Sequence, residues 1–392
     1  MICNHFSTSK PSLAFPTTVG QNRVSANLTD SLPLSEPAES GGASPRPMRP
    51  LLQRAILLCW LALAAIPSLS QAALFKVATL APEGSVWAEQ LARFADEVRR
   101  ETKGAVAFRI YYGGVMGDDR VMYRKMRIGQ LQGAGMTVTG LAAIVPDFRL
   151  LSIPFLFADY DEVDMAWREM LPYFRKEFRR KGLELLAATE VGFVYTMSTK
   201  PVRDTASLRA TKCWVPNGDP LSRIFLEEAG VHPTPLALPD VLTSLETGMV
   251  QTVFNGYYGA IVLQWFTRTA YVTDIPFGYA YGGLLLNGRA MRRLTASQRA
   301  AVEGAAQRHL GPALRRLTRQ SNAQALATLQ QEGITVVQTT PASRAAFAAC
   351  RDRTVQAAKG KLFSSAGYEK LTAALSRYRA SRPASPSPSH QP

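Results

Sequence analysis

The 392-residue chain has little of what metal sites and most enzyme active sites require. It contains four histidines and four cysteines, and no His-x-x-His or Cys-x-x-Cys spacing pairs any of them for a metal ion. Its glycine-rich stretches, residues 113–117 and 278–283, match neither a dinucleotide-binding pattern nor a phosphate-binding loop. The sequence therefore predicts no metal, no cofactor and no catalytic activity.

A concentrated block of positive charge is also lacking. The net charge is +15, from 45 Lys and Arg against 30 Asp and Glu, yet no polybasic tract carries it. Arginines scattered along helices usually mark solvated faces, whereas nucleic-acid binding needs a basic patch or stripe. We therefore expect no nucleic-acid partner.

Long hydrophobic runs are absent, and the longest apolar stretch lies near the start. Residues 55–66 follow Arg49 and Arg54 and are too few to cross a membrane. Small residues at positions 70 and 72 suit a signal-peptidase cut. We interpret residues 48–72 as a signal peptide that is cleaved near Ala72, and we expect the protein in the periplasm.

Predicted strands and helices alternate along the rest of the chain. Residues 75–80 are predicted as a strand, and Ser85 can cap a helix over residues 86–101. A long helical run begins after Thr295 and is either one helix or two with a kink near residues 311–312. The alternation predicts an α/β fold around a mostly parallel sheet.

Residues 188–220 form the stretch around which a site is expected. Two predicted strands, residues 191–199 and 211–215, are followed by a turn rich in proline and glycine. Small molecules bind α/β proteins at strand ends and at the turns that follow them. Trp214 lies at such an end, where its ring either faces a ligand or packs in the core.

Taken in order, these elements resemble the solute-binding subunits of TRAP transporters, the DctP family. The resemblance rests on FKVATLAPEGSVWAE, RIGQLQGAGMTVTG, SIPFLFADYDEV and PVRDTASLRATKCWVPNGDPLSRIFLEEAGVHPTPLALPDVLTSLETGMVQTVFNGYYGAI. It implies two α/β domains of the periplasmic-binding-protein kind, joined by a hinge, with a long helix crossing both. A ligand would be trapped in the cleft and handed to a membrane permease.

The predicted division of the chain follows from that resemblance. It consists of a disordered or untranslated extension (1–47), the signal peptide (48–72), domain I (73–191 plus about 280–318), domain II (192–279 plus about 319–372) and a disordered tail (373–392).

The chain departs from the family where carboxylates are usually bound. Val194 and Trp214 stand where such members have arginines, in patterns like Gly-Phe-Arg and Lys-Ile-Arg-Val-Pro. A guanidinium gives a carboxylate two charge-assisted hydrogen bonds, which these side chains cannot supply. Residues 251–255 keep only Asn255 of the family's Asp-Gly-Ala-Glu-Asn pattern. The replacements resemble the branch that works with a tetratricopeptide-repeat partner and is thought to handle hydrophobic ligands.

The main hypothesis is therefore a non-catalytic binding protein for an apolar or amphipathic solute. We expect the site to combine apolar walls with a few hydrogen-bonding groups. The candidate residues are Trp214, Val194, Phe193, Trp87, Phe254, Tyr258, Asn255, Thr139, Glu190 and Asn217.

Two alternatives remain at this point. The same fold could bind a mono- or dicarboxylate through a relocated arginine, such as Arg149 or Arg223. The other alternative is a hydrolase that uses Cys213 or Glu190.

Overall fold

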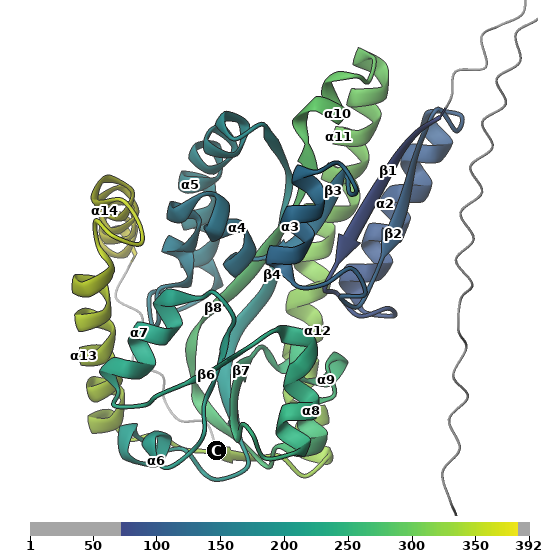
Figure 1. The fold of residues 1–392 in the computed structure, drawn as a ribbon. Helices are drawn as coiled ribbons and strands as arrows, with labels where there is room; N and C mark the ends of the chain where they lie inside the picture. Colours follow the sequence, from purple (N-terminus) through teal and green to yellow (C-terminus); the bar gives the residue numbers. More distant parts are fainter. Residues whose placement is uncertain (1–71, 383–392) are drawn as a thin grey trace, which may run out of the picture. The chain divides into compact units, whose positions relative to one another are not determined.

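The computed structural model describes residues 72–382 of the chain (Figure 1). The predicted extension and the predicted signal peptide up to residue 71 lie outside the described residues. Within residues 72–382, no helix is both long and apolar enough to cross a membrane.

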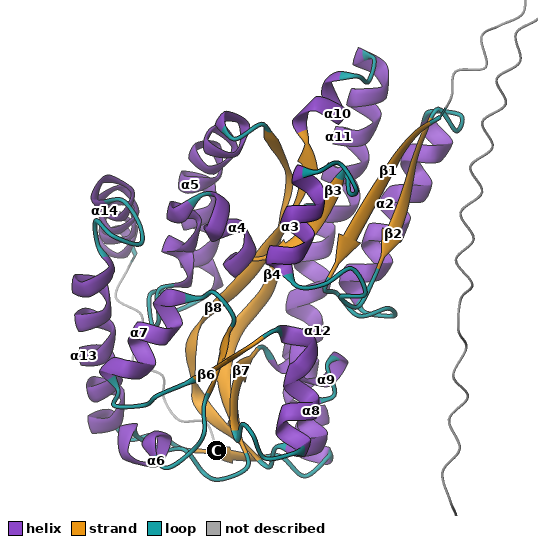
Figure 2. Cartoon of the chain, in the orientation of Figure 1, coloured by secondary structure: helices purple, strands orange, loops and turns teal. Residues whose placement is uncertain are grey.

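A seven-stranded sheet forms the centre of the described part (Figure 2). Its strands follow the order β2-β1-β3-β8-β4-β7, and β9 pairs with β8. Their bounds are β1 Ala73–Thr79, β2 Val106–Tyr111, β3 Gly133–Thr137, β4 Leu183–Ser198, β7 Thr252–Asn255, β8 Tyr271–Asn287 and β9 Thr335–Val337. A separate two-stranded sheet pairs β5 (Trp214–Pro216) with β6 (Thr234–Leu236).

The prediction of a mostly parallel sheet is wrong for its central strands. β8 runs antiparallel to both β3 and β4, and β4 runs antiparallel to β7. Two strands of 16 and 17 residues, β4 and β8, account for the difference because they pair along almost their whole lengths. The continuity of β8 is not evident from its sequence, because Pro276 and Gly278 interrupt the strand pattern.

Helices surround the sheet, and their starting signals are local. Ser85 accepts a hydrogen bond from the backbone of Ala88 and begins α2, as predicted. Thr295 and Gln298 form a capping box at the start of α11, where a cap was also predicted. The α-helices are α2 Val86–Glu101, α3 Asp119–Arg127, α4 Val138–Ile144, α5 Tyr160–Arg180, α6 Thr205–Arg209, α7 Pro220–Glu228, α8 Val241–Glu246, α9 Tyr257–Val262, α10 Gly288–Arg292, α11 Ala296–Leu310, α12 Pro312–Gln331, α13 Pro341–Ala358 and α14 Ser365–Ser381. Three 3₁₀ helices are η1 Pro146–Ser152, η2 Leu238–Asp240 and η3 Trp265–Arg268.

The described elements form two groups, which we call lobes. Lobe 1 comprises β1–β3, α2–α5, α10, α11 and α14, and lobe 2 comprises β5–β7, β9, α6–α9, α12 and α13. Strands β4 and β8 run through both lobes (Figure 1). The long helical run also passes from one to the other, because α11 packs on α2 whereas α12 packs on α9. Of the two predicted forms of this run, the structure has two helices with a break at Gly311.

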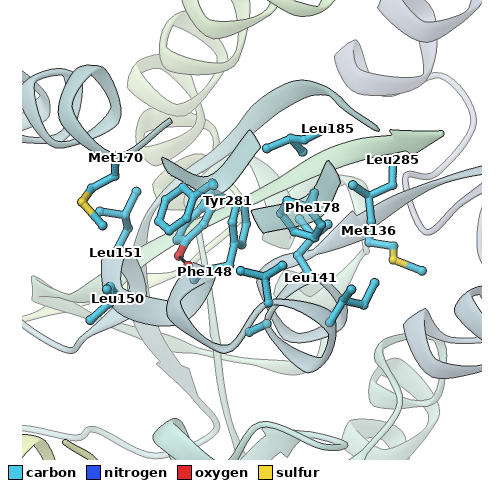
Figure 3. Close-up of a cluster of buried hydrophobic side chains, with 14 of the residues drawn as sticks. Met136, Leu141, Phe148, Leu150, Leu151, Met170, Phe178, Leu185, Tyr281 and Leu285 are labelled. Carbon is cyan, nitrogen blue, oxygen red and sulfur yellow. Dashed lines mark hydrogen bonds between the residues drawn. The ribbon is translucent and has the colours of Figure 1, made fainter. Parts of the chain in front are cut away.

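Successive residues of a strand pack into different hydrophobic clusters, because their side chains point alternately to the two faces of the sheet. In lobe 1, Leu285 and Tyr281 of β8 join a cluster with Phe148 (Figure 3), where the Tyr281 hydroxyl donates to the Phe148 carbonyl. Their neighbours Leu284 and Leu286 join a second cluster against α2 and α11. Lobe 2 likewise has two clusters, one beside α8, α9 and α12 and one beside α7 and α13. The sheet is therefore covered on both faces in each lobe.

The strand β4 is interrupted by a bulge where it passes between the lobes. Its register with β8 shifts between Glu190 and Gly192, and Gly192 has a φ of +112°. A Cβ at Gly192 would lie 2.9 Å from Nδ2 of Asn322 on α12. That amide donates to the Val191 carbonyl at 2.8 Å, so α12 is tied directly to the bulge. The predicted domain boundary after residue 191 falls here and stays a prediction.

The predicted tail begins too early. Helix α14 continues to Ser381 and packs on α5, so residues 373–381 are helical. Leu375, which lies in that stretch, is buried in the lobe 1 core.

Candidate ligand-binding site

A cavity of about 280 Å³ lies between the two lobes and is lined by both. Lobe 1 contributes the segments that follow β1 and β3, together with the start of α3 and Trp87 of α2. Lobe 2 contributes the turn after β5, the end of β7 and part of η2. The volume is just below the range of about 300–1,000 Å³ that is usual for small-molecule sites, so the cavity suits a small ligand.

Two glycines lie where the lobes approach each other at the edge of this cavity. A Cβ at Gly218, in the turn after β5, would lie 3.5 Å from Cδ of Arg120 on α3. A Cβ at Gly114, in the loop after β2, would lie 3.0 Å from Pro239 of η2. Both glycines have positive φ, at +88° and +75°, so the turns that bring the lobes together favour glycine.

Trp214 serves as both a cavity wall and a core residue, the two roles that the sequence left open. Its side chain lines the cavity but is only 3% exposed. The indole Nε1 donates to the Leu236 carbonyl at 3.1 Å, and the ring meets Trp265 edge-on at 5.3 Å between centroids. The wall is therefore fixed by the packing of lobe 2.

Seven more predicted site residues border the same cavity. They are Val194, Trp87, Thr139, Glu190, Asn217, Phe254 and Asn255. Thr139 reaches it from the first turn of α4, because β3 ends at Thr137. The Trp87 Nε1 donates to the Glu190 carbonyl at 2.8 Å, which holds the indole against the β4 bulge.

Phe193 and Tyr258 do not line this cavity. Phe193 precedes Val194 on a strand and therefore points to the other face, where its ring packs 4.8 Å from Tyr160. Tyr258 lies behind Trp87, with ring centroids 5.1 Å apart, and its hydroxyl accepts from the Val86 N–H at 3.0 Å. Tyr258 thus holds the start of α2 in place.

Glu190 borders the cavity, but its carboxylate is engaged elsewhere. Arg319 of α12 donates to both of its oxygens, at 2.6 and 3.0 Å, and also to both oxygens of Asp164 on α5. The guanidinium lies 4.3 Å above the Tyr160 ring. Burial alone would lower the pKa of Arg319, but its bonds to Glu190 and Asp164 outweigh that effect and raise the pKa. The group is a structural ion network beneath the cavity.

The arginines proposed for a relocated carboxylate site lie outside the cavity lining. Arg149 is buried and donates to the backbone carbonyls of Leu362 and Ala142. Arg223 lies on the exposed side of α7 and pairs with Glu227 at 3.7 Å. The arginine that does line the cavity is Arg120, at the start of α3. It forms no ion pair with any other described residue.

Many lining residues were not predicted from the sequence, and Arg120 is the one that matters most for the charge of the cavity. Among the others are Ser152, Phe277, Tyr279 and Tyr281. The sequence does contain one signal for Arg120: it follows the glycine-rich stretch that ends at Gly117, at the start of α3. A loop between a strand and a helix is a usual place for ligand contacts in α/β proteins.

Cys213 has the character of a structural thiol. It is fully buried, and burial raises the pKa of its thiol to about 11. A nucleophilic cysteine needs a lowered pKa and access to substrate, and Cys213 has neither. Both cysteines within the described range, Cys213 and Cys350, are free.

Asp119 is a buried carboxylate beside the cavity. Thr137 donates to it through both its backbone N–H and its hydroxyl. Burial raises the pKa of Asp119 to about 6, against an ordinary value of 3.8, and the bonds from Thr137 oppose that shift only in part. The folded protein therefore binds this proton more tightly than the unfolded chain does.

Protonation of Asp119 should stabilise the fold. This contribution is fully present below pH 3.8 and is lost as the pH rises through about 6. In urea titrations, the free energy of unfolding of Asp119→Asn should rise relative to that of the wild type as the pH goes from 4 to 7. The relative increase should be at most about 3 kcal/mol. Comparing the two proteins at each pH cancels the other titrating groups. A difference that does not change with pH would contradict the raised pKa.

Comparison with known proteins identifies one family. A family model described as DctP, bacterial extracellular solute-binding protein, family 7, matches residues 77–361. A solute-binding protein of Chromohalobacter salexigens is 30% identical over 169 residues, which is 43% of this chain and 50% of that protein. The 2,3-diketo-L-gulonate-binding periplasmic protein of Escherichia coli is 28% identical over 160 residues, 40% of this chain and 48% of that one. The match thus spans about half the length of these curated relatives.

Solved structures establish the same fold over a greater length. A TRAP periplasmic solute-binding protein from Desulfovibrio salexigens, with bound orotic acid, matches with a TM-score of 0.72 at 19% identity. The match covers 78% of this chain and 99% of that one. A Bordetella pertussis extracytoplasmic solute receptor that binds pyroglutamic acid matches with a TM-score of 0.71 at 21% identity. This match covers 77% of this chain and 99% of that one. The predicted α/β binding-protein fold is confirmed.

Proposed function

The chain belongs to the bacterial extracellular solute-binding protein family 7, and from that premise we propose that it traps a small organic acid between its lobes. Proteins of this family bind solutes and are not enzymes. The names of several relatives and solved structures place them in the periplasm or in TRAP systems. We extend both features to this chain: periplasmic export after cleavage near Ala72, and delivery of the ligand to a TRAP membrane permease.

The observation that carries the organic-acid proposal is the position of Arg120. It is the one cationic side chain among the residues described as lining the cavity, and it has no ion-pair partner within residues 72–382. Its side chain lies beside Gly218 of the opposite lobe. A planar guanidinium there can bind a carboxylate with two charge-assisted hydrogen bonds.

The ligands of structural neighbours agree with this choice. Orotic acid, galactonate and pyroglutamic acid are named for three of those proteins, and all are organic acids. Four carboxylates also border the cavity of this chain, but each already accepts hydrogen bonds. Asp118 and Asp219 cap α3 and α7, Asp119 accepts from Thr137, and Glu190 is bound by Arg319.

Burial energetics set the orientation of such an acid. A carboxylate placed against Val194 and Trp214 without a cation would cost several kcal/mol in lost hydration. The apolar part of the ligand gains roughly 25 cal/mol for each Å² buried against the same walls. The charge therefore stays with exposed Arg120 while the body of the acid points inward, toward Trp214 and Phe254.

The second candidate ligand is an uncharged apolar or amphipathic molecule. Val194 and Trp214 favour it, because these apolar walls border the cavity at the positions where carboxylate binders of the family have arginines. The same replacements are the sole support for a tetratricopeptide-repeat partner protein. The two candidates differ in whether binding depends on a negative charge.

Replacing Arg120 by glutamine tests the organic-acid proposal. Native mass spectrometry of the purified protein first identifies the bound molecule, and calorimetry then compares it with its uncharged primary amide. Loss of a hydrogen-bonded charge should weaken acid binding by about ten- to a hundredfold, and the wild type should discriminate against the amide by a similar factor. Arg124→Gln is the matched control, because Arg124 is exposed on the same helix and does not line the cavity. Tight binding of an uncharged molecule that Arg120→Gln leaves unchanged would favour the second candidate.

A further inference from the structure

A second cavity, of about 590 Å³, lies at the far end of lobe 1. It is bordered by the ends of α3 and α5, by the segments that lead into β3 and β4, and by α10. Two backbone bonds join these segments: Gly288 N–H donates to the Gly182 carbonyl at 2.9 Å, and Asn287 N–H donates to the Gln132 carbonyl at 2.8 Å. The cavity is therefore part of the folded sheet edge.

This cavity and the ligand site are separate. β3 begins at Gly133, beside the second cavity, and ends at Thr137, beside the ligand site. No residue borders both. A molecule bound in the second cavity would not occupy the space of the transported solute.

Five cationic side chains surround the second cavity, and no acidic residue borders it. They are Arg127, Lys181, Arg289, Arg292 and Arg293. All five are exposed, and none forms an ion pair within the described part of the chain. Elsewhere in residues 72–382 some exposed arginines have carboxylate partners, as Arg179 has in Glu184 at 2.9 Å, and others, such as Arg124 and Arg316, have none. Because the five cations have no carboxylate partners, the cavity carries positive charge only.

Helix dipoles account for only part of this arrangement. Arg127 and Lys181 lie at the C-terminal ends of α3 and α5, where a cation is favourable. The other three arginines come from α10, which has five residues and a correspondingly small dipole, and from Arg293 directly after it. Stabilisation of each helix end by a cation does not explain why the cations of three helices lie around the same cavity.

An exposed apolar side chain accompanies the cations. Ile128 borders the cavity and is 66% exposed, and only Val115 among the large hydrophobic residues of the described part is more exposed. A basic hollow beside a projecting aliphatic side chain matches the chemistry of a phospholipid surface, with phosphate outside and hydrocarbon beneath.

From these observations we infer that the second cavity binds the phosphate-bearing head group of an anionic phospholipid. The guanidinium groups of Arg289, Arg292 and Arg293 donate to the phosphate oxygens, and Arg127 and Lys181 add to the positive field. Ile128 lies against the interface of the bilayer. The site would retain the protein at a membrane surface while the ligand cavity stays free for solute.

Vesicle co-sedimentation tests this inference. The protein should sediment with vesicles of phosphatidylcholine mixed with phosphatidylglycerol, and not with vesicles of phosphatidylcholine alone. Each basic residue near an anionic surface contributes about a fivefold factor, so the combined change Arg289→Gln, Arg292→Gln and Arg293→Gln should weaken binding on the order of a hundredfold.

The control removes the same charge at exposed sites away from this cavity, by Arg316→Gln, Lys361→Gln and Arg377→Gln. It should lower vesicle binding by only a few-fold. Equal loss in both triple variants would show a general charge effect and overturn the site. Binding of inorganic phosphate by the protein, lost in the Arg289, Arg292 and Arg293 variant, together with no sedimentation on mixed vesicles, would show that a free anion occupies the cavity and would overturn the lipid assignment. Solute binding should be unchanged in the Arg289, Arg292 and Arg293 variant, so this test is independent of the proposed function.

Discussion

Replacement of Arg319 by alanine should lower the free energy of unfolding by about 3–5 kcal/mol. Arg319 binds Glu190 and Asp164 at the same time, each through two hydrogen bonds. The Glu190 side chain is 3% exposed, so without Arg319 its charge remains buried. Arg315, the nearest remaining cation, lies 3.9 Å from the Glu190 carboxylate, beyond hydrogen-bond distance. Urea denaturation at neutral pH measures the loss.

Two further variants separate the lost ion network from a general effect of shortening an arginine. Arg316→Ala removes a neighbouring, exposed arginine of α12 and should change stability by no more than about 0.5 kcal/mol. Adding Glu190→Gln to Arg319→Ala should recover part of the loss, because the unpaired buried charge is then gone. A loss below about 1 kcal/mol for Arg319→Ala would show that the network contributes little.

The network also ties together the elements that meet between the lobes. Asp164 is on α5, Glu190 is at the β4 bulge, and Arg319 is on α12. Asn322, one turn after Arg319, donates to the Val191 carbonyl and accepts from the Tyr258 N–H. These contacts fix the floor of the cavity to the long helical run. Ordering of the cavity and stability of the fold therefore depend on the same residues.

The parts of the fold that were predicted correctly depend on short-range signals. Ser85 and Thr295 begin helices through bonds to residues three positions later, so a local pattern is sufficient. The continuity of strand β8 depends instead on its pairing with β4. Pro276 lies opposite Tyr195 at a register shift. The shift allows the proline within the strand, and it exists only when β4 and β8 are paired.

The same distinction holds for the binding site. Trp214 was found because a strand end followed by a turn is a usual site position, and Val194 because it departs from a family pattern. Arg120 is an exposed helical arginine, and in sequence it resembles the many others on solvated faces. Arg120 and Gly218 are about a hundred residues apart in the chain, and they become neighbours only because the two lobes approach each other. No local pattern encodes that approach.

Trp214→Ala should reduce both stability and ligand affinity, and Trp265→Ala should reduce stability alone. Both indoles are almost fully buried, at 3% and 1% exposed, and they pack against each other. Each truncation should cost about 3–5 kcal/mol of unfolding free energy, measured by urea denaturation. Only Trp214 also borders the ligand cavity, so its removal enlarges the space that the ligand has to fill.

The pair of variants isolates the role of Trp214 as a wall. Calorimetry at a temperature where both variants are folded should show affinity for the natural ligand reduced by roughly ten- to a hundredfold in Trp214→Ala and by less than about threefold in Trp265→Ala. Trp214→Phe should recover most of the affinity, because the ring is kept while only the bond from Nε1 to the Leu236 carbonyl is lost. Equal losses of affinity in the two alanine variants would mean that Trp214 acts through the lobe 2 core and not through contact with the ligand.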